Sequence, residues 1–125
     1  MAAMYFLESI YLSIYYLFIK PDPYISVGCY VDSTVDRAMP SFISNYNGVT
    51  NSEAVRLCYV DTVLRGWNVF GVQNGSSCWS GSKAGQTYNK HGRTSSCSAG
   101  TLANSVYVIN GISKFLAQDN DFPAF

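Results

Sequence analysis

The sequence has 125 residues, eight acidic side chains against eight Lys or Arg, and a formal net charge of zero. This length allows one domain, and the balanced charge argues against a nucleic-acid partner, because that binding needs a basic face that neutralises phosphates. The four cysteines form no short CxxC pair, and His91 is the only histidine. An oxidised extracellular framework therefore fits the cysteines better than a zinc site.

Residues 1–20, MAAMYFLESIYLSIYYLFIK, are apolar and aromatic. Their position suits a signal peptide, although a basic first segment and a clear cleavage site are missing. A membrane anchor needs about 20 apolar residues, and this run is short and carries Glu8. A third alternative is that the start of the sequence is imperfect, so that these residues do not belong to the usual context of the domain. In each case we exclude these residues from the fold, and we expect membrane contact only through them, if they stay uncleaved.

The first predicted strand covers residues 24–32, YISVGCYVD, after a proline-containing linker. Asp32, Asp36 and Arg37 lie at its end, and we interpret them as an ion pair that holds a turn. Residues 41–49, SFISNYNGV, are rich in Ser, Asn and Gly, which predicts a loop that leads to a helix.

One helix is predicted from residue 50 onward. Thr50 and Glu53 match a capping box, in which each side chain accepts a hydrogen bond from a free backbone N–H. Gly66 stands where the helix should end, because glycine accepts the left-handed conformation. Apolar residues at helical spacing predict a buried face formed by Ala54, Leu57, Cys58, Val60 and Leu64.

A hairpin is predicted after the helix. Trp67, Val69 and Phe70 begin a β-rich run, and Asn74-Gly75 is a strong two-residue turn signal, since both positions tolerate positive φ. We expect Trp67 to lie in the core.

The last third of the chain predicts a long polar connection at 81–98 and a final strand at 104–110. The connection carries Lys83, Lys90, His91 and Arg93. Residues 111–125 are interpreted as a tail or linker. The predicted fold is α+β: a small disulfide-stapled antiparallel sheet of about four strands, with one helix packed across it, over residues 24–110.

Four cysteines allow three pairings, and their number does not choose among them. A bond between Cys58 and Cys78 would staple the helix to the hairpin. A bond between Cys29 and Cys97 would tie the first strand to the last segment. We predict these two disulfides.

Short motifs along the chain resemble a known family when they are taken together. They are GCY at 28–30, RA at 37–38, EA at 53–54 with Cys58, FGV at 70–72, CWSG at 78–81 and SVY at 105–107. In this order and spacing they resemble the WSC domain, a cysteine-rich extracellular module, over residues 28–109. The family usually carries more cysteines, and Val55 and Ser80 stand at two of the positions. The chain is therefore similar to divergent four-cysteine versions of the domain.

The resemblance implies a fold similar to the PAN/apple type and a carbohydrate-binding role. It implies a secreted, extracellular protein without a cofactor. The alternatives are a protein–protein interaction module of the PAN/apple type, which would use Trp79, Tyr88 and the basic segment 83–93, and a structural extracellular domain. Binding of an anionic glycan, or of a protein through the basic segment, should weaken as the salt concentration rises. Binding of a neutral sugar by stacking should hardly change with salt.

Trp79 is the main candidate for a carbohydrate platform. If Cys78 points into the core, strand alternation sends Trp79 outward. Gln86, Tyr88 and Asn89 are close in sequence and offer hydrogen bonds to hydroxyls. The competing interpretation is that the 81–98 segment covers Trp79.

Two further motifs concern modification and catalysis. Asn74-Gly75-Ser76 is an N-glycosylation sequon at the hairpin tip, although the turn alone explains Asn-Gly. We expect no enzymatic activity, because His91 has no acid beside it in sequence and disulfides would use every cysteine. Ser80 and Lys83 match SxxK, but the companion motifs of those enzymes are missing.

Overall fold

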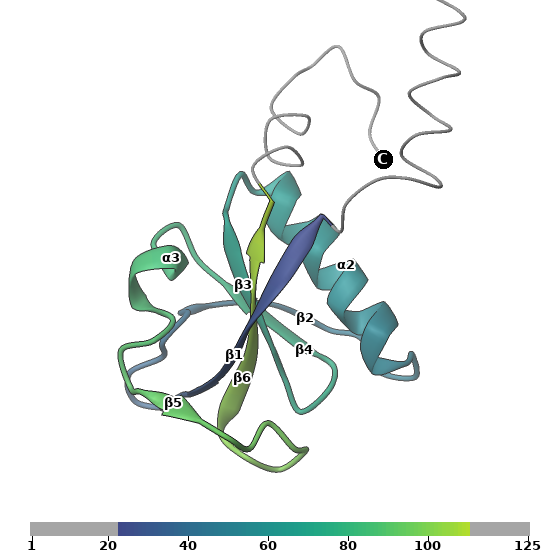
Figure 1. Cartoon of the computed structure of the whole chain (residues 1–125). Helices are drawn as coiled ribbons and strands as arrows, with labels where there is room; N and C mark the ends of the chain where they lie inside the picture. The colour runs from purple at the N-terminus through teal and green to yellow at the C-terminus, as the bar shows by residue number, and fades with distance from the viewer. Residues whose placement is uncertain (1–22, 111–125) are drawn as a thin grey trace, which may run out of the picture.

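The computed structural model describes residues 23–110, which form an antiparallel sheet with helix α2 across one face (Figure 1). The described strands lie in the order β2-β4-β3-β6-β1-β5. The elements are β1 (Tyr24–Val31), β2 (Ser41–Asn45), α2 (Asn51–Leu64), β3 (Val69–Gln73), β4 (Ser77–Ser80), α3 (Ala84–Thr87), β5 (Arg93–Thr94) and β6 (Ala103–Ile109). The α+β class is confirmed. The predicted leader and tail lie outside the described residues.

Helix α2 begins and ends where the sequence predicts. The Thr50 hydroxyl accepts a hydrogen bond from Glu53 N at 3.2 Å, and Gly66 has a φ of 75° just beyond the helix. The capping box is only half formed, because the Glu53 carboxylate pairs with Arg56 (2.6 Å) instead of reaching back to the cap. Of the helices in the described range, none is long and apolar enough to cross a membrane.

The buried face of α2 differs from the predicted one at its C-terminal end. Leu64 is 72% exposed, whereas Thr62 is fully buried and donates its hydroxyl to the Cys58 carbonyl at 2.7 Å. That bond satisfies the Thr62 hydroxyl, so the polar side chain takes the position facing the sheet. Val55 and Cys58 pack against Phe70 on β3, which places the main core between α2 and the sheet.

The hairpin of β3 and β4 is formed as predicted. Asn74 and Gly75 both have positive φ, 55° and 77°, as a two-residue hairpin turn requires. The Asn74 side-chain oxygen also accepts a hydrogen bond from Gly100 N at 2.8 Å. The turn thereby holds the loop that precedes β6.

Two segments that we interpreted as loops contain regular structure. Within 41–49, β2 pairs with β4, so that Phe42 lies opposite Trp79 and Ser44 opposite Cys78. Within 81–98, the structure has the one-turn helix α3 and the short edge strand β5. The expectation of about four strands was therefore too low, since the described sheet has six. Trp67 is half-buried and belongs to neither core cluster.

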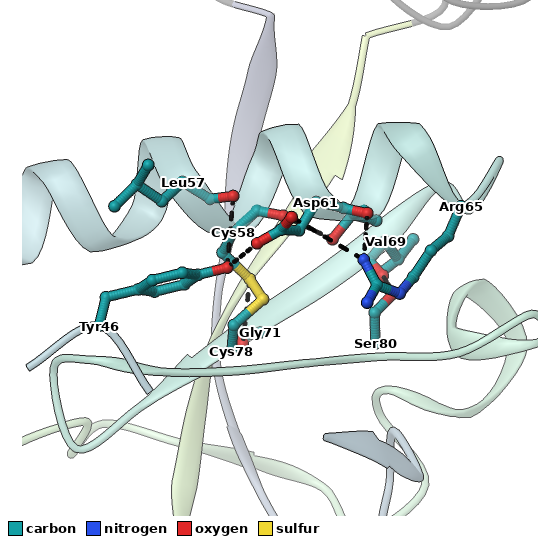
Figure 2. The surroundings of a disulfide bond; sticks show 10 residues. Tyr46, Leu57, Cys58, Asp61, Arg65, Val69, Gly71, Cys78 and Ser80 are labelled. Carbon is teal, nitrogen blue, oxygen red and sulfur yellow. Dashed lines mark hydrogen bonds and ion pairs between the residues drawn. A yellow bond between two sulfur atoms is a disulfide. The ribbon is translucent and has the colours of Figure 1, made fainter. Parts of the chain in front are cut away.

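Both predicted disulfides are present. Cys58–Cys78 joins α2 to β4 within the main core, and both residues are fully buried (Figure 2). Cys29–Cys97 joins β1 to the segment between β5 and β6, where both residues are half-buried. In Figure 2 the Tyr46 hydroxyl also points to the Asp61 carboxylate on α2, which adds a polar contact beside the buried disulfide.

Gly28 lies at an irregularity in β1, where the register with β6 shifts. Its φ is 116°, and Arg93 Nη2 lies 2.7 Å from the place that a Cβ would occupy. We expect Gly28→Ala to destabilise the domain by about 1–3 kcal/mol, because alanine strains this backbone. Thermal unfolding measures the effect, with Ser26→Ala, exposed on the same strand, as the control. An unchanged melting temperature for Gly28→Ala would contradict the requirement for glycine.

Candidate functional site

The sheet face opposite α2 carries the candidate site. Figure 1 shows α3 on the side of the sheet away from α2. A second core cluster lies on this face, with Met39, Val69, Ala84 and Val106 at its centre. The side chains of β4 alternate between the two faces of the sheet, as predicted. Cys78 is buried toward α2, and Trp79 packs with the second cluster on the other face.

Trp79 is half-buried, and its neighbours differ from the expected ones. The Arg37 guanidinium lies over the indole, 4.1 Å from the ring centroid, and the Phe42 ring lies 5.1 Å away. Phe42 is 54% exposed, so it presents the more open aromatic surface of the pair. Because the residues around Phe42 are rich in Ser, Asn and Gly, the sequence predicted a loop there and did not indicate Phe42 as a site residue. The adjacent apolar residues Phe42 and Ile43 within the run SFISN were the signal available, since both suit a strand.

A buried carboxylate fixes Arg37 over the indole. Asp32 is almost fully buried, and its two oxygens accept hydrogen bonds from Arg37 Nη1 (2.7 Å) and Ala38 N (2.9 Å). The expected ion pair at this turn is therefore confirmed for Asp32 and Arg37, whereas Asp36 pairs with a residue outside the predicted group. Burial opposes the charge on Asp32, but the hydrogen bonds from Ala38, Arg37 and Gln73 outweigh it and lower its pKa.

The polar network continues along the sheet from Asp32. Gln73 Nε2 donates to Asp32 Oδ2 (2.9 Å) and to Asn104 Oδ1 (3.2 Å). Since the carboxylate only accepts hydrogen bonds, it orients the Gln73 amide, which in turn orients Asn104. Asn104 Nδ2 is then left buried without an acceptor among the described residues, as is Trp79 Nε1. Two unused donors therefore lie on this face.

The other predicted site residues lie on or beside α3. Tyr88 packs edge-on against Tyr30, with ring centroids 5.0 Å apart, and both belong to the second cluster. Gln86 and Asn89 are exposed. The structure places Tyr88 and Trp79 on the same face but gives Tyr88 a different ring partner. A joint role for Trp79, Gln86, Tyr88 and Asn89 stays a prediction.

The basic segment after α3 is tied to the turn that carries Arg37. Lys90 Nζ pairs with Asp36 Oδ1 at 2.6 Å, and His91 Nε2 lies 2.7 Å from the Asp36 backbone oxygen. The hydrogen bond from Lys90 lowers the pKa of Asp36. These contacts tie the turn to the segment that follows α3.

Two sequence motifs have clear places in the structure. The Ser80 hydroxyl is buried and donates to the Val69 carbonyl at 2.5 Å (Figure 2), so the structure gives it a packing role. Asn74 is exposed at the hairpin tip, and its glycosylation stays a prediction. Within residues 23–110, no group of three or more His, Cys, Asp or Glu side chains is placed to hold a metal ion.

The comparisons with known proteins identify the family. The sequence model of the WSC domain matches residues 26–105, which is more than half of the chain. The chain therefore belongs to the WSC domain family, as its motifs indicated. At a coarse level this membership, together with the disulfides, is typical of an extracellular or cell-surface module and suggests carbohydrate binding. No curated protein and no solved structure matches the chain.

Proposed function

We propose that the domain is a secreted, non-catalytic module that binds carbohydrate weakly on the sheet face opposite α2. The observation that carries this proposal is the pair of Phe42 and Trp79, which stand directly opposite each other on β2 and β4. Their rings lie 5.1 Å apart, and Phe42 is open to solvent. An apolar ring at the surface suits the apolar face of a sugar, and nearby polar groups suit its hydroxyls.

Arg37 contributes to this surface by its position. Its guanidinium is held between the indole of Trp79 and the buried carboxylate of Asp32. The side chain is 24% exposed, so part of Arg37 is open to solvent beside the aromatic pair. A donor that is already fixed loses little conformational entropy when it binds a hydroxyl. The Phe42, Trp79 and Arg37 group therefore combines an apolar contact with an oriented donor.

A glycan array with the oxidised 125-residue chain tests the proposal, followed by titration with the best ligand. We expect Phe42→Ala to weaken binding about two- to tenfold, because an aromatic contact is lost. Trp79→Phe should weaken it less, since the ring stays in place beneath Arg37. Trp79→Ala is a poorer variant, because the indole packs in the second core cluster.

Leu64→Ala is the matched control, because Leu64 is also an exposed apolar residue but lies on α2. Equal affinity for the parent and Phe42→Ala would exclude this surface. Failure of the folded parent to bind any glycan would exclude carbohydrate binding. The PAN/apple-type alternative, protein binding, would then be the better explanation.

A further inference from the structure

The sheet face opposite α2 is covered over its middle and open at one side. Met39 is fully buried, and its methyl group lies so close to Gly71 on β3 that a Cβ there would clash with it. Helix α3 also contacts β3. The next strands outward are β4 and β2, and β2 ends the described sheet. Because Phe42 and Asn45 on β2 are exposed, the open part of this face is the side formed by β2 and β4.

The strand register places four side chains on this open side. Phe42 lies opposite Trp79, and Asn45 lies opposite Ser77. Ser77 and Trp79 are two residues apart on β4, so both project from the same face, about 7 Å apart along the strand. Asn45 is three residues from Phe42, but the bulge between them adds one residue and returns Asn45 to the same face. We call Phe42, Asn45, Ser77 and Trp79 the β2–β4 platform.

The polar half of the platform offers hydrogen-bonding groups that the fold does not use. The Asn45 side-chain oxygen accepts a hydrogen bond from the Ser76 hydroxyl at 2.8 Å, which fixes the amide. The Asn45 Nδ2 then keeps two N–H groups without an acceptor among the described residues. The half-exposed Ser77 hydroxyl likewise has no hydrogen-bond partner within residues 23–110. A fixed donor beside a free hydroxyl suits the hydroxyls of a sugar whose ring lies on Phe42.

The charge beside the platform is already balanced. Arg37 lies over Trp79, and its Nη1 donates to the buried Asp32 carboxylate at 2.7 Å and to Gln73 Oε1 at 3.4 Å. The four residues of the platform carry no charge themselves. A sulfate or a uronic carboxylate bound here would find no unpaired cation and would be repelled by the negative charge of Asp32. The platform therefore fits an uncharged ligand.

We propose that the β2–β4 platform binds an uncharged polysaccharide, and that Asn45 and Ser77 form the hydrogen bonds to its hydroxyls. This inference rests on the proposed carbohydrate-binding function, and it adds the charge class of the ligand and two binding residues. The apolar face of one sugar ring lies on Phe42, the Asn45 Nδ2 donates to one hydroxyl, and the Ser77 hydroxyl bonds another. An apolar protein segment would also cover Phe42, but it would bury these polar groups without partners, which weakens binding.

Binding of the oxidised 125-residue chain to surfaces that carry one immobilised saccharide each tests this proposal. The neutral probes are dextran, mannan, hydroxyethyl cellulose and the best neutral glycan of the array, and the charged probes are dextran sulfate and alginate. At least one neutral probe should bind more tightly than either charged probe, with little change between about 50 and about 300 mM salt. On that probe, Asn45→Asp and Ser77→Ala should each weaken binding about two- to tenfold, because a hydrogen bond is lost.

The matched controls make the same substitutions away from the platform. Ser44→Ala removes a hydroxyl from the residue next to Asn45, but Ser44 lies opposite Cys78 and therefore belongs to the face toward α2. Asn68→Asp adds the same charge at an exposed residue just before β3, whereas the row of Asn45 and Ser77 crosses the other end of that strand. Both controls should bind like the parent, and an equal loss of affinity in them would overturn the assignment of Asn45 and Ser77.

The outcomes separate this inference from the proposed function. If a neutral probe binds, and Phe42→Ala weakens it while Asn45→Asp and Ser77→Ala bind like the parent, the inference fails and the proposed function stands. The same conclusion follows if dextran sulfate or alginate binds more tightly than every neutral probe, because the ligand is then anionic. If the folded parent binds no saccharide at all, both fail.

Discussion

Reduction of the two disulfides is expected to unfold the domain near body temperature. Loss of one native disulfide from a small secreted domain typically costs about 2–5 kcal/mol, against a total stability of about 5–15 kcal/mol. Cys29–Cys97 spans 68 residues and Cys58–Cys78 spans 20, so the chain-entropy model assigns them about 4.4 and 3.3 kcal/mol. Calorimetry with and without reductant measures the effect, and an unchanged melting temperature would contradict it.

The two disulfides should be reduced in a fixed order. Cys58 and Cys78 are fully buried beneath α2, whereas Cys29 and Cys97 are half-buried beside the exposed serines 95, 96 and 98. Because thiol exchange requires access to a sulfur atom, Cys29–Cys97 should react first. Differential alkylation at low reductant concentration should label Cys29 and Cys97 before Cys58. Simultaneous labelling of all four would show instead that reduction proceeds through global unfolding.

The elements with strong local signals were predictable from sequence. Thr50 and Gly66 mark the ends of α2, and the Asn74-Gly75 turn sets the hairpin. These signals determine the backbone geometry of only a few neighbouring residues, so they do not depend on how distant parts of the chain pack. The Cys58–Cys78 disulfide followed from the same local units, because its two cysteines lie on the helix and on the hairpin strand beside it. The Cys29–Cys97 disulfide followed from the expected tie between the first strand and the last segment.

The elements that depend on distant pairing were missed. The residues of β2 have a loop-like composition, and the strand forms because β4 offers them a free edge. β5 has two residues and exists only through its pairing with β1. Likewise, Arg37 and Trp79 are far apart in the sequence, so no local sequence pattern predicts their contact. The composition of the site was therefore partly predictable, but its geometry was not.

Removal of the Asp32 charge is the second change with a large expected effect. Asp32→Asn keeps an acceptor for Ala38 N but places an amide NH₂ against two other donors, Arg37 Nη1 and Gln73 Nε2. Arg37 then loses its buried partner. Breaking a buried ion pair from one side costs about 3–5 kcal/mol, so we expect a loss of this size in the free energy of unfolding. Chemical denaturation measures it, and Glu53→Gln, which breaks an exposed pair on α2, is the matched control.

The pH dependence of stability gives an independent test of the same residue. The pKa of Asp32 is lowered in the folded state, so the folded protein binds fewer protons there than the unfolded chain. The stabilisation from Asp32 is thus fully present above its unfolded pKa, about 3.9, and is lost as pH falls through the lower folded value. The parent should therefore lose stability below about pH 4 more steeply than Asp32→Asn. Parallel acid profiles for the two proteins would show that Asp32 does not titrate with unfolding, and that the buried network derives its stability from hydrogen bonds that are independent of this charge.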